Sequence, residues 1–260
     1  MEESNQKFVV GGAIAAVLVI AGVIYFWPKS ESEQPIAKTQ TPVAAPQPEA
    51  DYPVPAPKAD APQLPALEGS DPLFADLVGS VFGNDTVQTW IVKNDVARHV
   101  VVTVDNLPRK KVAERLKPIK PIPGKFAVSG PEGAQTIAAE NAARYNNAVR
   151  ALETVDTQAL AAAYFKVYPL LQQAYVELGY PNGYFNNRVI EVIDHLLATP
   201  EVPGPIQLTQ PNVMFEFADP RLEALSAGQK TMLRMGPEHA AVVKKKLREL
   251  RSAFTAKAPG

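Results

Sequence analysis

Apolar positions along the middle of the chain recur with the three- and four-residue spacing that places side chains on one face of a helix. The longest series is Leu160, Tyr164, Val167, Leu171, Ala174 and Leu178. A second series is Phe185, Val189, Val192 and Leu196. Asp156 is expected to cap the first helix, Pro169 to kink it, and the turn at 179–183 to end it. Thr199-Pro200 is expected to stop the second helix.

Helices are also predicted at both ends of the folded part. Ser70, followed by Asp71-Pro72, is typical of an N-cap and first turn, and predicts a short helix through Phe82. The segment 84–105 ends in a run of β-branched residues, but no turn residue interrupts it, so a helix is favoured over a strand. Gly236-Pro237 separates two closing helices. The last of these is expected to bury Val243, Leu247, Leu250 and Phe254.

Three short stretches are β-strand candidates. One is KFAVSG (125–130), and two more are PIQLTQP (205–211) and VMFEF (213–217), split by Pro211-Asn212 as in a hairpin. Strands and helices do not alternate in the order of a doubly wound sheet. The predicted fold class is therefore mainly α with a few short β-strands (α+β), in a single globular domain over residues 64–256.

The N-terminal part differs, because a short tail (1–7) precedes an uncharged run from Phe8 to Trp27. At about 1.5 Å per residue, a helix of this length spans about 30 Å, the thickness of the bilayer hydrocarbon core. A cleaved signal peptide is the competing interpretation, but no small-x-small cleavage site follows the run. We therefore expect residues 8–27 to be a retained transmembrane helix in contact with the lipid bilayer.

Residues 28–63 are rich in Pro and Ala and contain few large apolar side chains. This composition predicts a disordered linker with polyproline II character, which reaches on the order of 100 Å when extended. Lys7 and Lys29 give almost no charge asymmetry across the span, but a short N-terminal tail before a large C-terminal domain resembles a signal-anchor. We therefore expect a single-pass inner-membrane protein whose C-terminal domain is periplasmic and ends in a tail at 257–260.

Composition changes this picture in two respects. The chain has no cysteine, which excludes disulfides, thiolate nucleophiles and Cys-ligated metal sites. Its net charge of −1 conceals two basic segments, 98–125 and 221–257, each with an excess of six positive charges. If these segments share one surface, which would include Lys244, Lys245 and Lys246, they are expected to bind an envelope protein or an anionic envelope component. The alternative is two solvated helix faces.

The most unusual stretch is the turn LGYPNGYFNNR (178–188), which concentrates aromatic and polar side chains. Tyr180, Tyr184, Asn186 and Arg188 are candidates for the floor of a groove that binds a peptide or a glycan. The alternative is a rigid corner between two helices, with rings that fill the core and Asn residues that cap a helix. The sequence leaves both interpretations open.

Candidate catalytic groups are few. Glu191 and His195 fall on one face of a predicted helix, where they could share a metal or carry out acid–base chemistry with Asp194 nearby. Arg188 on the same face favours an ordered charge pair instead. A second nearby histidine, a nucleophile elbow and a phosphate loop are all missing from the sequence. We therefore expect no catalysis, no cofactor and no metal, and the alternative is an envelope hydrolase with a site near Glu191 and His195.

Four stretches of the chain resemble one bacterial family, the domain of unknown function numbered three thousand and fourteen. They are PALEGSDPLF (65–74), TVDNLPR (103–109), LGYPNGYFNNRVIEVIDHLLATP (178–200), and the long stretch at 218–251 that begins ADPRLEALSAGQK. The resemblance implies an N-terminal span and a variable tether, and it implies no activity, substrate or catalytic residue.

The sequence as a whole therefore favours a membrane-anchored binding or scaffolding domain without catalysis, on the extracytoplasmic side. A loose helix-turn-helix pattern at 218–251 leaves DNA binding as a further alternative. DNA binding requires a cytoplasmic domain, so no nucleic acid is expected as a partner.

Overall fold

The structure is a computed structural model that describes residues 49–56, 62–83, 91–92, 94–112, 116–120, 122 and 124–256. The transmembrane helix predicted at 8–27, most of the linker predicted at 28–63 and the tail at 257–260 lie outside these residues. Within the described residues, no helix combines the length and the hydropathy needed to cross a bilayer. The predicted domain boundaries remain predictions.

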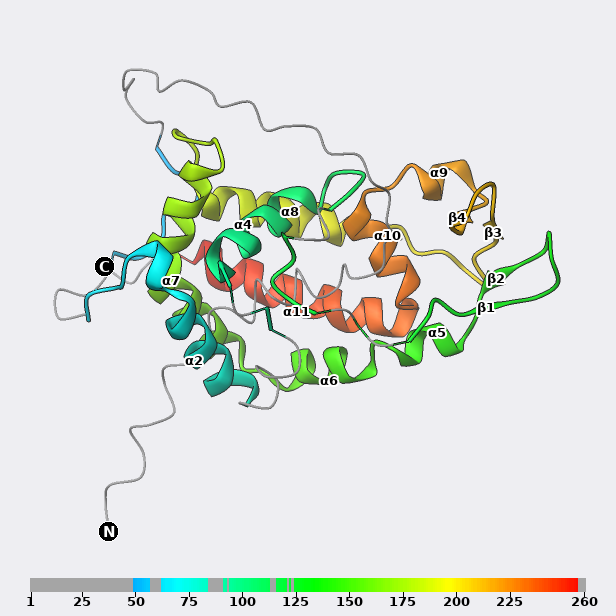
Figure 1. Cartoon of the computed structure of the whole chain (residues 1–260), viewed down its shortest axis with the longest axis horizontal. Helices are drawn as coiled ribbons and strands as arrows, with labels where there is room; N and C mark the ends of the chain where they lie inside the picture. Colours follow the sequence, from blue (N-terminus) through cyan, green and yellow to red (C-terminus); the bar gives the residue numbers. More distant parts are fainter. Residues whose placement is uncertain are drawn as a thin grey trace, which may run out of the picture.

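The described part of the chain is mainly helical with two short β-hairpins, which confirms the predicted mainly α class with a few short strands (Figure 1). In chain order its elements are the 3-10 helix η1 (Leu67–Gly69), α2 (Asp71–Phe82), α4 (Val96–Asn106), β1 (Val128–Ser129), β2 (Thr136–Ile137), α5 (Glu140–Ala143), α6 (Asn146–Thr154), α7 (Thr157–Glu177), α8 (Phe185–Leu197), β3 (Leu208–Thr209), β4 (Glu216–Phe217), α9 (Pro220–Glu223), α10 (Ala227–Arg234) and α11 (Pro237–Thr255). Helix α11 contacts α6, α7 and α8, and α4 contacts α7 and α8, so the core lies between these helices.

The two central helices, α7 and α8, form where the apolar spacing predicts them. Asp156 caps α7 as expected, because its side chain accepts a hydrogen bond of 2.7 Å from the backbone N–H three residues later. Every residue of the two predicted apolar series is buried except Leu178, which is half-buried. Helix α7 continues through Pro169. Helix α8 ends at Leu197, and its Leu196 carbonyl accepts a bond of 2.6 Å from Thr199 Oγ1.

Helix α4 shows why the β-branched run folds as a helix. The Asp71 carboxylate on α2 caps it from outside, accepting hydrogen bonds from the backbone N–H groups of Asp95 (3.0 Å) and Val96 (2.9 Å). The buried valines that follow are Val100, Val101 and Val104. Tertiary packing therefore outweighs the weak helix propensity of valine. The predicted helix is confirmed over α4, and residues 84–90 lie outside the described part. The prediction of one uninterrupted helix over 84–105 is wrong. Ile91 forms a β-bridge with Ile119, and the left-handed backbone of Asp95 (φ 51°) makes a turn before α4.

Helix α2 begins where the sequence predicts but is not capped as predicted. Ser70 precedes the helix, yet its hydroxyl donates to the Leu67 carbonyl at 2.7 Å and does not bind the first turn of α2. The expectation of a serine cap is wrong because the backbone of Ser70 is αR, with φ −84° and ψ −13°. A capping side chain normally requires an extended backbone.

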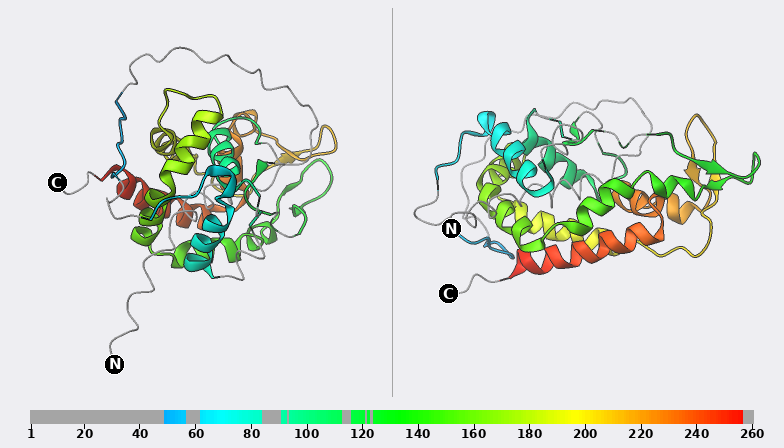
Figure 2. Two further views of the ribbon diagram at one scale, coloured as in Figure 1. Left: turned by 60° about the vertical axis from the view of Figure 1, so that its left-hand side comes forward. Right: turned by 90° about the horizontal axis from the view of Figure 1, so that it is seen from below.

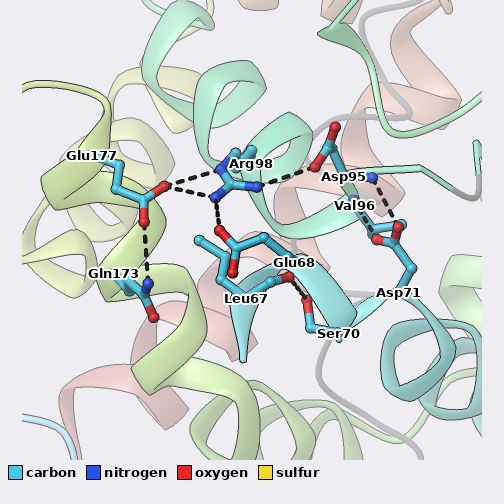
Figure 3. A network of polar contacts seen from close by, with 9 residues as sticks. All are labelled: Leu67, Glu68, Ser70, Asp71, Asp95, Val96, Arg98, Gln173 and Glu177. Carbon is cyan, nitrogen blue, oxygen red and sulfur yellow. Dashed lines mark hydrogen bonds and ion pairs between the residues drawn. The ribbon is translucent and has the colours of Figure 1, made fainter. Parts of the chain in front are cut away.

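A network of charged side chains joins η1, α4 and α7 (Figure 3). Arg98 on α4 pairs with Glu68 at 2.8 Å and with Glu177 at 2.9 Å. It also pairs with Asp95 at 3.1 Å. These hydrogen bonds, the one to Glu68 first, raise the pKa of Arg98. The network therefore holds the first elements of the domain against its central helices with a cation that stays charged.

The two hairpins lie together at one end of the molecule (Figures 1 and 2). Their antiparallel registers place Val128 opposite Ile137 and Leu208 opposite Phe217. The N–H of Ile137 donates to the Ile206 carbonyl at 3.1 Å, so the hairpins are joined. The predicted strand at 125–130 and the predicted hairpin at 205–217 are confirmed.

Residues 49–56 lie at the opposite end, beside the C-terminal end of α11 (blue and red in Figure 2). The side chains of Tyr52 and Val54 are half-buried against the core. These residues belong to the predicted linker, and in the structure they contact the folded domain. We call residues 49–56 the docked segment.

Candidate binding groove at the corner between α7 and α8

A buried carboxylate organises the corner at which α7 leads into α8. The side chain of Asp105, near the C-terminal end of α4, is 4% exposed. Its carboxylate accepts hydrogen bonds from Arg188 Nε at 3.0 Å and from Arg109 Nη2 at 2.6 Å. Arg188 also donates to the Asp105 carbonyl at 2.8 Å and pairs with Glu191 at 2.8 Å. These bonds fix the start of α8 to the end of α4.

Aromatic packing makes the same corner rigid. The rings of Tyr175 and Tyr180 stack with centroids 4.5 Å apart, and the Tyr180 hydroxyl donates to Asp105 at 3.2 Å. Gly183 permits this packing, because a Cβ at that position would lie 3.0 Å from the Tyr175 ring. Gln172 on α7 accepts a hydrogen bond of 2.8 Å from the first backbone N–H of α8. The N-terminal end of α8 is therefore capped by the side chain of a glutamine on α7.

Two of the three asparagines of the turn, Asn186 and Asn187, hold the docked segment. The N–H of Tyr52 donates to Asn187 Oδ1 at 3.1 Å, and Asn187 Nδ2 donates to Asp51 at 2.9 Å. Asn186 is fully buried and donates to the Tyr52 carbonyl at 2.9 Å. Asn186 also donates to the carbonyl of Phe254 at 3.4 Å, in the last turn of α11, so this asparagine caps the C-terminal end of a helix as the alternative interpretation expects. Both asparagines join α8 to a segment more than a hundred residues earlier.

An open groove of about 560 Å³ lies between the docked segment and the start of α8. The tyrosines that line it are Tyr52, Tyr175 and Tyr184. The charged residues that line it are Glu49, Asp51, Arg188, Glu191 and Asp194. Among these lining residues only Arg188 is cationic, and it is paired with Asp105 and Glu191. Asp194 is paired with Arg251, which is not one of the lining residues. The excess of negative charge therefore comes from Glu49 and Asp51, and such an excess attracts cations.

Two residues that line the groove, Tyr175 and Arg188, have shifted pKa values. Burial, followed by the charge of Asp105, raises the pKa of Tyr175 to about 12, so its hydroxyl stays neutral. Burial alone would lower the pKa of Arg188, but the hydrogen bond that Arg188 donates to Glu191 and the charge of Asp105 raise it on balance. The groove therefore presents the neutral hydroxyl of Tyr175 and a guanidinium that keeps its charge.

The structure brings together some of the predicted binding residues and separates others. Tyr184, Arg188 and Glu191 line the groove. Tyr180 belongs to the corner network, and Asn186 is buried beneath the docked segment. The groove interpretation and the corner interpretation thus each describe part of the same turn.

The three lysines predicted as a basic patch on α11 do not line the groove. Lys244 and Lys246 are buried, and their Nζ atoms donate to the carbonyls of Thr199 at 2.8 Å and Val155 at 2.9 Å. Lys245 is exposed. Two of the three amines therefore cap the C-terminal ends of α8 and α6, as cations near helix C-termini do.

We expect Lys246→Ala to lower the free energy of unfolding by about 1–2 kcal/mol, because the Val155 carbonyl loses a charged donor. Lys245→Ala is the matched control and should change stability by less than about 0.5 kcal/mol. Urea unfolding of the purified proteins, followed by circular dichroism, measures both. Equal losses in the two variants would contradict the placement of these amines.

The candidate catalytic residues on α8 each have a separate partner. His195 Nε2 lies 2.8 Å from the hydroxyl of Ser226, which forms the capping box of α10. Asp194 pairs with an arginine of α11, and Glu191 pairs with Arg188. In the described ranges, no group of three or more His, Asp and Glu side chains is arranged to hold a metal ion. A hydrolase site near Glu191 and His195 stays a hypothesis.

His195 gives a pH-dependent contribution to stability. Burial, followed by the charge of Arg188, lowers its pKa from the ordinary 6.5, with Glu191 opposing. The unfolded chain therefore takes up a proton near pH 6.5 while the folded state still resists it, and stability is lost as the pH falls below that value. We expect His195→Gln to show a shallower loss. Urea unfolding at several pH values from about 7.5 to about 5.5 measures the slopes, and identical slopes would contradict this assignment.

Two parts of the site, Asp105 and the docked segment, were not predicted from the sequence. Asp105 lies in a segment with excess basic charge, but it follows the buried Val101 by four residues, and this position on the apolar face is the signal for burial. The docked segment lies in a Pro-rich stretch, and its signal is Tyr52, the one aromatic residue of the predicted linker.

The chain matches a known protein family over most of its folded part. A family model described as "Protein of unknown function (DUF3014)" matches residues 96–251, more than half of the chain. This range contains three of the four stretches that carry the sequence resemblance, and the stretch at 65–74 precedes it. No curated protein and no solved structure gives a significant match. The chain therefore belongs to the family described as Protein of unknown function (DUF3014).

Proposed function

We propose that this protein is a non-catalytic binding domain, held at a membrane by residues 8–27, that binds a cationic segment of an envelope protein. The observation that carries the proposal is the groove, in which tyrosine rings lie among four carboxylates. Glu191 and Asp194 are paired with arginines, so Glu49 and Asp51 supply the excess of negative charge. Lys and Arg place their charge beside carboxylates and their stems against aromatic rings. The volume of about 560 Å³ is within the range of small-ligand sites.

The uncharged run and the Pro-rich stretch support the anchor and the tether. With the short tail in the cytoplasm, the domain is periplasmic and meets envelope proteins. Alkaline phosphatase fused after Gly260 should then be active. A well-expressed but inactive fusion would refute this orientation.

An anionic envelope component is the second candidate, favoured by the two basic segments. Contacts within the chain already engage part of that positive charge. Arg98 pairs with three carboxylates, Lys244 and Lys246 donate to backbone carbonyls, and Arg251 pairs with Asp194 at 2.6 Å. These contacts reduce what the basic segments offer to an acidic partner, so the cationic partner is preferred.

A peptide titration tests the proposal. The full chain in phosphatidylcholine nanodiscs is titrated with a fluorescent peptide of alternating Lys and Gly, and with a Glu–Gly peptide of the same length. We expect binding of the first peptide only, a decrease with added salt, and a Kd raised about fivefold to tenfold by Glu191→Gln. Glu132→Gln, in the loop between β1 and β2, is the control and should bind like the unchanged protein.

Binding of the Glu–Gly peptide instead would contradict the proposal and favour the anionic component. Equal Kd values for Glu191→Gln and Glu132→Gln would also contradict it, because they would place the bound peptide outside the groove.

A further inference from the structure

We infer that the docked segment is a removable wall of the groove, so that ligand binding and docking of the membrane tether form one coupled equilibrium. The inference rests on the proposed function for the existence of a ligand. It goes further by assigning to residues 49–56 both a binding role and a control of tether length.

The docked segment forms one wall of the groove. The docked segment contributes Glu49 and Asp51, half of the carboxylates that line the groove, and Tyr52, one of its three tyrosines. The other wall comes from α8 and the turn before it. A chain with the segment undocked therefore lacks one side of the site.

Polar bonds and apolar contacts attach the docked segment to the domain. The polar bonds include those of Tyr52 and Asp51 with Asn187, and that of the Tyr52 carbonyl with Asn186. The Tyr52 side chain also forms a hydrogen bond with Arg251 on α11. Apolar contact comes from the half-buried side chains of Tyr52 and Val54. Each such bond adds little net free energy, because water replaces it when the segment leaves. A short segment held in this way undocks reversibly.

The groove and the attachment site of the docked segment share a residue. Asn187 binds the segment with its side chain and also lines the groove. A cation beside Asp51 and Glu191 therefore bridges the docked segment and α8, and it binds the docked state better than the undocked state. A ligand with such a preference shifts the population toward docking, and docking raises the affinity for the ligand by the same factor.

Docking of this segment shortens the predicted tether. When the segment is docked, the chain toward the membrane leaves the domain at residue 49 and not near residue 62, where the next described stretch begins. At about 3.1 Å per extended residue, this shortens the predicted tether by up to about 40 Å. A bound partner thus draws the domain toward the membrane, and a partner too far from the membrane is bound more weakly.

The experiment uses Val54→Gly, which removes an apolar contact of the docked segment without changing a residue that lines the groove. Val213→Gly is the matched control, because Val213 is 83% exposed in the β3–β4 hairpin. Hydrogen exchange of the Tyr52 amide, measured by mass spectrometry on the full chain in phosphatidylcholine nanodiscs, reports docking. The Lys–Gly peptide titration reports binding.

We expect the Tyr52 amide to be protected in the free protein and more protected with the peptide at saturation. Val54→Gly should lower the protection about threefold or more and raise the peptide Kd by a similar factor, since only the docked fraction binds. Val213→Gly should change neither quantity.

Three results would overturn the inference. If Val54→Gly loses the protection but binds the peptide like the unchanged protein, the coupling is absent while the proposed function stands. If the Tyr52 amide exchanges without protection in the unchanged protein, docking itself is absent. If the unchanged protein is protected but no Lys–Gly peptide binds, the proposed function fails and the coupling fails with it.

Discussion

Asp105→Ala is expected to lower the free energy of unfolding by about 3–5 kcal/mol, the range found when one partner of a buried ion pair is removed. The carboxylate accepts hydrogen bonds from Arg188, Arg109 and the Tyr180 hydroxyl. Without it, the guanidinium of Arg188, whose side chain is 15% exposed, loses its buried counter-charge. Urea unfolding of the variant and of the unchanged protein measures the difference.

Two further variants separate this effect from a general loss of charge. Glu191 is the exposed partner of Arg188, and Glu191→Gln should cost less than about 1 kcal/mol. Asp105→Ala combined with Arg188→Met should cost less than the sum of the two single changes, because no buried cation is left without its partner and Arg109 is exposed to solvent. If Asp105→Ala costs no more than Glu191→Gln, the corner does not depend on this carboxylate.

Asn186→Ala is expected to cost about 3 kcal/mol and to release the docked segment. The Asn186 side chain accepts a hydrogen bond of 3.1 Å from the Tyr164 hydroxyl and donates to the carbonyl of Tyr52. Tyr164 is fully buried, so its hydroxyl would be left without this acceptor at a cost of about 1–3 kcal/mol, and the cavity adds to that. Urea unfolding measures the stability, and exchange of the Tyr52 amide measures docking.

Asn187→Ala is the matched control for this second change. Asn187 is half-buried and binds only the docked segment among the contacts described above, so its loss should expose the Tyr52 amide at less than about 1 kcal/mol of global stability. Adding Tyr164→Phe to Asn186→Ala should restore part of the lost stability, because the buried hydroxyl is gone. A full loss in that double variant would contradict the role assigned to the hydroxyl.

The helical part of the fold follows from the sequence where the apolar period is long. The series in α7, α8 and α11 predicted these helices, and their buried faces agree with the prediction. Helix α4 was predicted but its start was not, because the start is set by the left-handed backbone of Asp95 and by the cap from Asp71 on another helix. The short elements β2 and α5 were not predicted, because a two-residue strand and a four-residue helix carry too few positions for a period to be recognised. Helix α6, which has nine residues, was also not predicted.

The candidate site followed from the sequence only in part. The turn at 178–188 placed Tyr184 and Arg188 correctly on one local corner, because neighbours in sequence are neighbours in space. Asp105 and Tyr52 are far from that turn in the chain, and nothing in the local pattern indicates their pairing with α8. The three lysines of α11 are neighbours in sequence but do not share one exposed surface. Their side chains are long enough for two buried amines to reach carbonyls of other segments.

The groove as the site of a cationic partner is tested most directly by photo-cross-linking. The Lys–Gly peptide, carrying a benzophenone, is irradiated with the full chain in phosphatidylcholine nanodiscs, and the cross-linked residues are identified by mass spectrometry. The groove predicts cross-links concentrated in residues 49–52 and 182–194, with loss of yield in the presence of unlabelled peptide. Cross-links concentrated on the hairpins at the opposite end, or spread evenly over the surface, would contradict it.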